Sequence, residues 1–257
     1  MARKIVVTSG KGGVGKTTVC AILGEKLAKL NKNVVILDLD FGLNNLDVVL
    51  GVEGKITYNL EDVIEGRCRV KQAIISCRQN LSIIESGHSY GDRVTAQNIK
   101  LLIEGLNNYD YVLMDCPAGI DDGFTRAVAA ADEAIVVVNP TVSSLRDADK
   151  VINILNNYKL DGIYAVANRV RGDLIAAGKI LSVEEIEDVM KVPVIGAIPE
   201  DDLVLTSKAK EVTYGEANIA YKMLAKFIVT NGGRVYDCES QYRGFFSRFK
   251  KSMKKRA

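Results

Sequence analysis

The sequence of 257 residues predicts an α/β fold, a doubly wound and mainly parallel sheet with helices on both faces. Two observations predict it. Short β-branched runs alternate along the chain with helical patterns, and this order implies right-handed crossovers between parallel strands. Most of the strand-like runs are continuously apolar, as expected for strands that are covered on both faces. Hydrophobic residues make up 47% of the chain, enough for the core of one large domain.

The predicted elements follow one another with short connections. Seven short apolar runs are predicted as strands, at residues 4–9, 33–40, 81–86, 111–116, 134–139, 163–170 and 192–198. Six segments with helical periodicity lie at about residues 16–31, 95–107, 122–131, 143–158, 182–190 and 215–230. We therefore expect one domain over residues 1–230, a hydrophilic tether at 231–241 and a separate terminal segment at 242–257.

Charge and cysteine content narrow the class of protein. The net charge is +2, but residues 242–257 hold seven of the 34 basic residues and no acidic one, which leaves −5 on the remainder. An attraction to anions is therefore expected in the tail. The five cysteines form no C-x-x-C pair, which argues against a zinc site and a disulfide framework and indicates a reducing cytosol. No secretion signal and no apolar run of membrane-spanning length is evident, so a cytoplasmic protein is expected.

The stretch SGKGGVGKTT at residues 9–18 joins the first predicted strand to the first predicted helix. It fits the pattern G-x-x-x-x-G-K-[ST], in which backbone N–H groups and a helix start hold phosphate oxygens. Lys16 would reach the β- and γ-phosphates, and the Thr17 hydroxyl would bind Mg²⁺. The predicted phosphate-binding residues are Gly10, Lys11, Gly12, Gly13, Val14, Gly15, Lys16, Thr17 and Thr18. The alternative, a glycine turn without a ligand, is disfavoured by the match of motif and context. The sequence thus predicts a P-loop NTPase.

Acidic residues follow two other predicted strands. Asp115 follows the apolar run YVLM, and Asp38 and Asp40 close the run VVILDLD. Parallel strands end along one crevice, so these carboxylates are expected beside the phosphate loop. Thr17, Asp38 and Asp115 are the predicted Mg²⁺ residues, although Asp38 as a helix cap or turn residue stays an alternative.

The base is predicted to be adenine. Guanine-specific P-loop proteins use an Asn-Lys-x-Asp element, whose aspartate accepts hydrogen bonds from the guanine ring. Here the late strand ends in Asn168 and Arg169, and Arg171 stands where that aspartate would be. ATP is therefore favoured over GTP.

A second lysine, Lys11, distinguishes this loop from the general motif. With it, KGGVGKTT resembles the deviant Walker A motif of the MinD/ParA family of ATPases. DLDFGLNNLD at 38–47 is similar to switch I of that family, DCPAGID at 115–121 to switch II, and AIPED at 197–201 to a late loop near the adenine. The resemblance covers essentially the whole chain.

The resemblance implies a role for individual residues. Lys11 matches the lysine that crosses a dimer interface to the partner's nucleotide and is needed for hydrolysis. Asp40 matches the acid that positions the attacking water, and Asn45 and Gly119 match switch residues. The implied catalytic residues are Lys11, Lys16 and Asp40, and the implied adenine contacts are Asn168, Arg169 and Pro199. Cys116 departs from the family pattern, which often has serine there; the change is small.

The function implied by the resemblance is a slow Mg²⁺-dependent ATPase that forms an ATP-dependent homodimer. It would lie on the inner face of the cell membrane and position the division site by placing the division inhibitor MinC, with MinE or another topological regulator as a further partner. ATP hydrolysis would release it. Two alternatives from the same family stay open, a ParA-type DNA partition ATPase and a regulator of flagellar number. The acidic body disfavours the DNA reading.

The terminal stretch QYRGFFSRFKKSMKKRA combines aromatic and basic residues. On a helix its apolar residues follow i, i+3, i+4, i+7 and i+11, one stripe flanked by lysine and arginine, which is typical of a helix at a membrane interface. The predicted membrane residues are Tyr242, Phe245, Phe246, Phe249, Lys250 and Lys251. Docking of this stripe on the body is the alternative. A single helix of this kind binds weakly, so two in a dimer would bind far more tightly.

Overall fold

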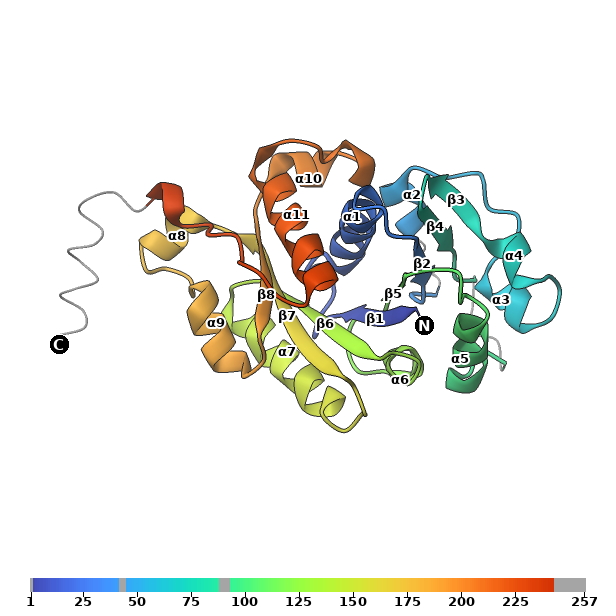
Figure 1. Ribbon diagram of the computed structural model, residues 1–257. Coiled ribbons are helices and arrows are strands. Elements are labelled where there is room, and N and C mark those ends of the chain that lie inside the picture. Colours follow the sequence, from blue (N-terminus) through green and yellow to red (C-terminus); the bar gives the residue numbers. More distant parts are fainter. Residues whose placement is uncertain (1, 42–44, 88–92, 243–257) are drawn as a thin grey trace.

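The computed structural model describes residues 2–41, 45–87 and 93–242 (Figure 1). These residues form one eight-stranded sheet with helices packed against it. Its strands are β1 (Arg3–Thr8), β2 (Val34–Asp38), β3 (Ile75–Arg78), β4 (Leu81–Ile84), β5 (Tyr111–Asp115), β6 (Glu133–Val138), β7 (Gly162–Val170) and β8 (Val194–Pro199). Their order is β3-β4-β2-β5-β1-β6-β7-β8, and every pair is parallel except β3 with β4. The doubly wound, mainly parallel fold is confirmed.

Helices cover both faces of the sheet. They are α1 (Lys16–Lys29), α2 (Leu46–Leu50), α3 (Leu60–Ile64), α4 (Val70–Ala73), α5 (Ala96–Glu104), α6 (Asp122–Val128), α7 (Val142–Leu155), α8 (Gly172–Ala176), α9 (Val183–Met190), α10 (Asp202–Thr206) and α11 (Gly215–Thr230), with short 3₁₀ turns η1 (Ala209–Glu211) and η2 (Ser240–Tyr242). Figure 1 shows α1 and α11 above the sheet and α5, α6, α7 and α9 below it. Two hydrophobic clusters, one on each face, form the core.

The seven predicted strands and six predicted helices are all present, with ends shifted by a few residues. The prediction missed β3, which pairs antiparallel with β4 through a tight turn where Asn80 has a φ of 63°. It also missed the helices of four or five residues, α2, α3, α4, α8 and α10. Segments this short contain barely one turn, so no helical period can be read from them.

The register of the central strands decides where the site forms. Asp38 at the end of β2 is paired with Asp115 at the end of β5, and Asp115 is paired with Val7 of β1. The phosphate loop leaves β1 two residues later. One edge of the sheet therefore carries both acids and the loop, as expected for the carboxyl ends of parallel strands.

After α11 the chain crosses the body toward α8, where the described residues end. Val235 and Tyr236 pack against the core and Cys238 is buried, although this segment was predicted as a tether. Gly172 of α8 approaches it so closely that a Cβ there would lie 1.8 Å from the Cys238 carbonyl oxygen. The tail residues Phe245, Phe246, Phe249, Lys250 and Lys251 lie outside the described residues, so the tail stays a prediction. Among the described helices, none has the length and apolar character needed to cross a membrane.

A buried lysine joins α1 to the segment before α11. The Lys26 ammonium donates hydrogen bonds to the Val212 carbonyl and to Oδ1 of Asn218, the latter at 3.0 Å. Only 2% of Lys26 is exposed. Burial, reinforced by nearby cations of which Lys29 is the strongest, lowers the pKa of Lys26 to about 8.

We predict a distinct pH dependence of stability from Lys26. Its pKa of about 8 in the folded protein lies below the ordinary value of 10.5, so the unfolded chain binds more protons between these values. The free energy of unfolding of the wild type should therefore rise with pH from 8 to 10.5, relative to Lys26→Met, by up to about 1.4 kcal/mol per pH unit. Urea unfolding at stepped pH measures this, and parallel curves for the two proteins would contradict it.

Candidate nucleotide-binding site

The loop between β1 and α1 has the backbone geometry of a phosphate cradle. Gly13 and Gly15 adopt φ values of 78° and 96°, the left-handed region that glycine enters without strain. A Cβ placed on Gly12 or Gly13 would meet no atom within 4 Å, so the space in front of the loop is open. α1 begins at Lys16 directly behind it and adds the partial positive charge of a helix N-terminus.

Lys16, Thr17 and Asp115 lie together beside this cradle. Asp115 is buried, and burial raises its pKa to about 6, while the Thr17 hydroxyl and the Lys16 ammonium act in the opposite direction. Its Oδ1 atom is buried without a hydrogen-bond partner among the described residues. A cation nearby would relieve the cost of this buried charge. Within the described ranges there is no group of three His, Cys, Asp or Glu residues that could hold a metal by itself, so a Mg²⁺ here would also need the Thr17 hydroxyl and ligand oxygens.

Asp38 is the second buried acid at this edge. Burial raises its pKa well above the ordinary value, and the charge of Asp115 raises it further. Its Oδ1 accepts a 2.9 Å hydrogen bond from the backbone N–H of Asp40. This bond fixes the turn that carries Asp40 out of the strand, so the structure brings all three predicted acids to the loop. Asn45 is exposed and occupies the N-cap position of α2. Residues 42–44, which lead to it, are outside the described residues.

The N-terminal half of α7 packs directly against the phosphate loop. A Cβ on Gly10 would lie 2.2 Å from the Asp147 carbonyl carbon, so only glycine permits this approach. Lys11 reaches the same helix and donates a 3.0 Å hydrogen bond to the Ser143 hydroxyl. Sequence reasoning missed Ser143, because no local motif indicates that residues 132 positions apart meet.

The predicted switch II residue Gly119 also contacts the loop. Its backbone N–H donates a 3.0 Å hydrogen bond to the Ser9 carbonyl, and its φ is 92°. The neighbouring Cys116 is fully buried, and burial raises the pKa of its thiol well above the ordinary value. Cys116 is therefore a small core residue, while Gly119 links residues 117–121 to the loop.

The predicted adenine residues line one cavity of about 110 Å³ beside the loop. The Asn168 amide donates a 2.8 Å hydrogen bond to the Val14 carbonyl. Arg169 has a φ of 55°, an uncommon conformation for a side chain of its size. The cavity is lined by Gly15, Thr18, Asn168, Arg169, Pro199, Glu200, Asp201, Val204 and Leu205. Glu200 and Asp201 belong to the segment AIPED, which the sequence placed near the adenine. Val204 and Leu205 were missed, because α10, which carries both of them, is too short to predict.

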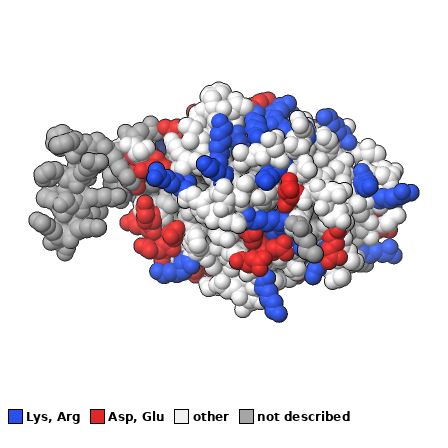
Figure 2. Space-filling view, viewed as in Figure 1, with Lys and Arg blue, Asp and Glu red and all other residues white. Residues whose placement is uncertain are grey.

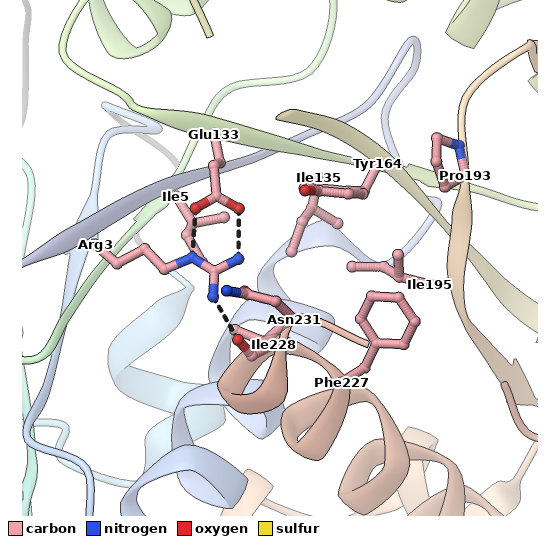
Figure 3. Close-up of a pocket in the computed structure, with 10 residues that line it drawn as sticks. All are labelled: Arg3, Ile5, Glu133, Ile135, Tyr164, Pro193, Ile195, Phe227, Ile228 and Asn231. Carbon is pink, nitrogen blue, oxygen red and sulfur yellow. Dashed lines mark hydrogen bonds and ion pairs between the residues drawn. The ribbon is translucent and has the colours of Figure 1, made fainter. Parts of the chain in front are cut away.

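A second cavity, of about 160 Å³, lies at the opposite edge of the sheet. Figure 3 shows Arg3 between the Glu133 carboxylate and the Ile228 carbonyl, facing apolar side chains such as Phe227. The Arg3 Nη2 to Glu133 Oε2 distance is 2.7 Å. These contacts join β1, β6 and the end of α11. None of the described site residues lines this cavity, so we assign it a structural role.

The fold and the site define a P-loop nucleotide-binding protein. A turned glycine loop, a lysine and a threonine at a helix start, and a buried acid on the adjacent strand together form its phosphate and metal side.

Comparison with known proteins gives the family. Residues 5–214 match the model of the CobQ/CobB/MinD/ParA nucleotide binding domain. The septum site-determining protein MinD of Synechocystis is 44% identical over 82% of this chain and 80% of its own length. MinD in the MinC:MinD cell division protein complex of Aquifex aeolicus is 37% identical, with a TM-score of 0.83, over 91% of this chain and 98% of that one.

MinD of Pyrococcus horikoshii, solved with Mg-ADP, is 32% identical, with a TM-score of 0.77, over 89% of this chain and 96% of that one. The chain belongs to the MinD proteins of this nucleotide-binding family.

We predict that Gly10→Ala destabilises the nucleotide-free protein by about 1–3 kcal/mol, because the new methyl group would overlap the α7 backbone at Asp147. Gly12→Ala is the matched control in the same loop. Its Cβ meets open space, so the change should stay within about 0.5 kcal/mol. Urea unfolding without nucleotide compares the two, and equal stability would refute the contact.

Proposed function

We propose that this protein is a Mg²⁺-dependent ATPase switch that places a division inhibitor on the membrane. It binds ATP, dimerises, and associates with the inner face of the cell membrane through residues 242–257. There it holds MinC and so helps to position the division site, until hydrolysis releases it. The observation that carries the proposal is a phosphate loop with two lysines, one buried in the cradle and one directed away from it.

The nucleotide chemistry follows from the residues around the loop. Lys16 and the loop amides bind and neutralise phosphate oxygens, and Thr17 with Asp115 would hold Mg²⁺, which stabilises charge on the transferred phosphoryl group. Asp40 is placed by its bond to Asp38 and orients the attacking water. Positioning and charge neutralisation by Lys16, Lys11 and Mg²⁺ carry the catalysis without the need of a strong base, and the intrinsic rate is slow. The Mg-ADP found in the Pyrococcus horikoshii relative supports the choice of ligand.

The ATP-dependent dimer is supported by the surface around Lys11. Val142 is 78% exposed at the start of α7, and Ile120 is 49% exposed next to Gly119. In the proposed dimer these two exposed apolar side chains, which flank the phosphate loop, would be covered by the partner. To reach a partner's nucleotide, Lys11 must leave Ser143, so dimerisation and a change at α7 are coupled.

The tail supplies the membrane anchor. Its basic residues attract an anionic surface at about 1 kcal/mol each, and its aromatic stripe enters the interface. One such segment binds weakly, whereas two in a dimer bind with high effective concentration. ATP thereby controls membrane binding without contacting the tail. A MinC:MinD complex from Aquifex aeolicus supports MinC as the protein held there, and MinE or another regulator would stimulate hydrolysis.

The two alternatives are separable by one comparison. A DNA partition ATPase would bind duplex DNA in ATP and would not need the tail aromatics. A regulator of flagellar number could share the tail, and only its protein partner would differ. Co-sedimentation of the full chain with anionic vesicles and with DNA, in ATP, in ADP and without nucleotide, separates the membrane and DNA functions.

We predict that Val142→Asp weakens the ATP-dependent dimer by about tenfold or more, because a charge would be buried without a partner. Val189→Asp is the matched control, since Val189 is 52% exposed on α9, away from the loop. Analytical ultracentrifugation with ATP and a hydrolysis-blocking Asp40→Ala background measures the dissociation constants. If both variants dimerise like their parent, the proposed interface is wrong.

We predict that truncation after Tyr242 abolishes sedimentation with anionic vesicles in ATP, and that Phe246→Ser with Phe249→Ser does nearly the same. Lys16→Ala should also prevent sedimentation, although its tail is intact, because it cannot form the ATP state. Retained binding of the truncated chain would refute the anchor. Wild-type binding by Lys16→Ala would refute the control by ATP.

A further inference from the structure

Basic side chains gather on one surface of the body, although the net charge of the body is negative. Figure 2 shows basic side chains gathered over the upper part of the molecule, where Figure 1 places α1 and α11. Five residues define this basic face, Lys29, Arg78, Lys210, Lys222 and Lys226. The body apart from the tail has a net charge of −5, so acidic residues elsewhere on the body outweigh this basic face.

The fold brings these residues together from four separate segments. Lys29 ends α1, Arg78 ends β3, Lys210 lies in η1, and Lys222 and Lys226 are one turn apart on α11. Lys29, Lys222 and Arg78 all act on the buried Lys26, and Lys29, Arg78 and Lys210 all act on the buried Glu25. Lys29 and Arg78 act on both buried residues. Helix α1 also contacts α11 and η1, so the segments that carry these lysines are neighbours.

Acidic residues near the basic face are already engaged. The Glu25 carboxylate is buried and paired with Arg78. Glu53 pairs with Lys208 at 3.0 Å, and Glu211 accepts a 3.1 Å hydrogen bond from the Lys208 backbone N–H. In the described part of the chain, Lys29, Lys210, Lys222 and Lys226 are exposed and form no ion pair. Their charges are therefore available to a ligand.

The side chains of the basic face favour a lipid surface over a nucleic acid. Four of the five are lysines, flexible point charges that suit a diffuse layer of phosphates, whereas fixed recognition of phosphate or base relies on the arginine fork. Leu30 and Ile219, 44% and 49% exposed, lie on the same helices as Lys29 and Lys222. Stacking aromatics for single-stranded nucleic acid are not part of this face.

We propose that the basic face lies against anionic lipid headgroups when the tail is inserted, and so sets the orientation of the body on the membrane. The inference rests on the proposed function, because the tail provides the first contact. The described chain ends at η2, next to α8 (Figure 1), and the 15 residues beyond it include seven further basic residues.

The test compares two charge-reversal variants of the full chain. Lys222→Glu with Lys226→Glu changes the basic face, and Lys100→Glu with Lys159→Glu makes the same change in net charge at exposed lysines in and near the helices of the opposite face. Vesicles of phosphatidylcholine with about one third phosphatidylglycerol are titrated in ATP. We expect the basic-face variant to lose about tenfold or more in vesicle affinity, and the control to stay within about twofold.

The outcomes separate this inference from the proposed function. If the wild type does not sediment with vesicles in ATP, the proposed function fails and the inference with it. If the wild type binds and the basic-face variant binds equally well, or both variants lose equally, only the inference fails. If the basic-face variant keeps vesicle binding but loses duplex DNA binding, the basic face binds nucleic acid instead of lipid. Unchanged urea unfolding shows that each variant is folded.

Discussion

The parallel register of β2, β5 and β1 is the constraint on which this structure depends. It sets Asp38 opposite Asp115 and both beside the strand that leads into the phosphate loop. Burial raises the pKa of both acids, and the charge of Asp115 raises the pKa of Asp38 further. The fold accepts this destabilisation at the sheet edge. A bound cation and the Lys16 ammonium would stabilise the ionised form of these acids, and this stabilisation would favour binding of a charged ligand together with its cation.

The phosphate loop directly contacts two neighbouring segments, α7 and residues 117–121. Gly10 lies against the α7 backbone, Lys11 is held by Ser143, and Gly119 is bonded to Ser9. Any ligand that draws Lys11 away from α7 or displaces Gly119 changes the surface around Val142 and Ile120. In the proposed dimer, recognition of phosphate and formation of the protein interface would therefore be parts of one physical change.

Membrane binding in this scheme is a sum of weak terms. The tail contributes aromatic insertion and seven basic residues, and the basic face adds lysines that contact headgroups without entering the bilayer. No single term holds the protein there, so a change from monomer to dimer is sufficient to switch binding on or off. In the proposed scheme the tail would fix the protein to the membrane surface, and the basic face would decide which side of the body faces it.

The sequence by itself determined the fold class, the phosphate loop with Lys11 and Lys16, and the acids Asp38 and Asp115, because loop, strand end and helix start are local features with fixed spacing. Only the tertiary structure decided that Ser143 holds Lys11, that α10 closes the base cavity and that β3 turns back along β4. It also showed lysines from α1, η1 and α11 in one basic face, where net charge indicated only an acidic body. Contacts between residues far apart in sequence depend on how helices pack across the sheet, and neither composition nor periodicity encodes that packing directly.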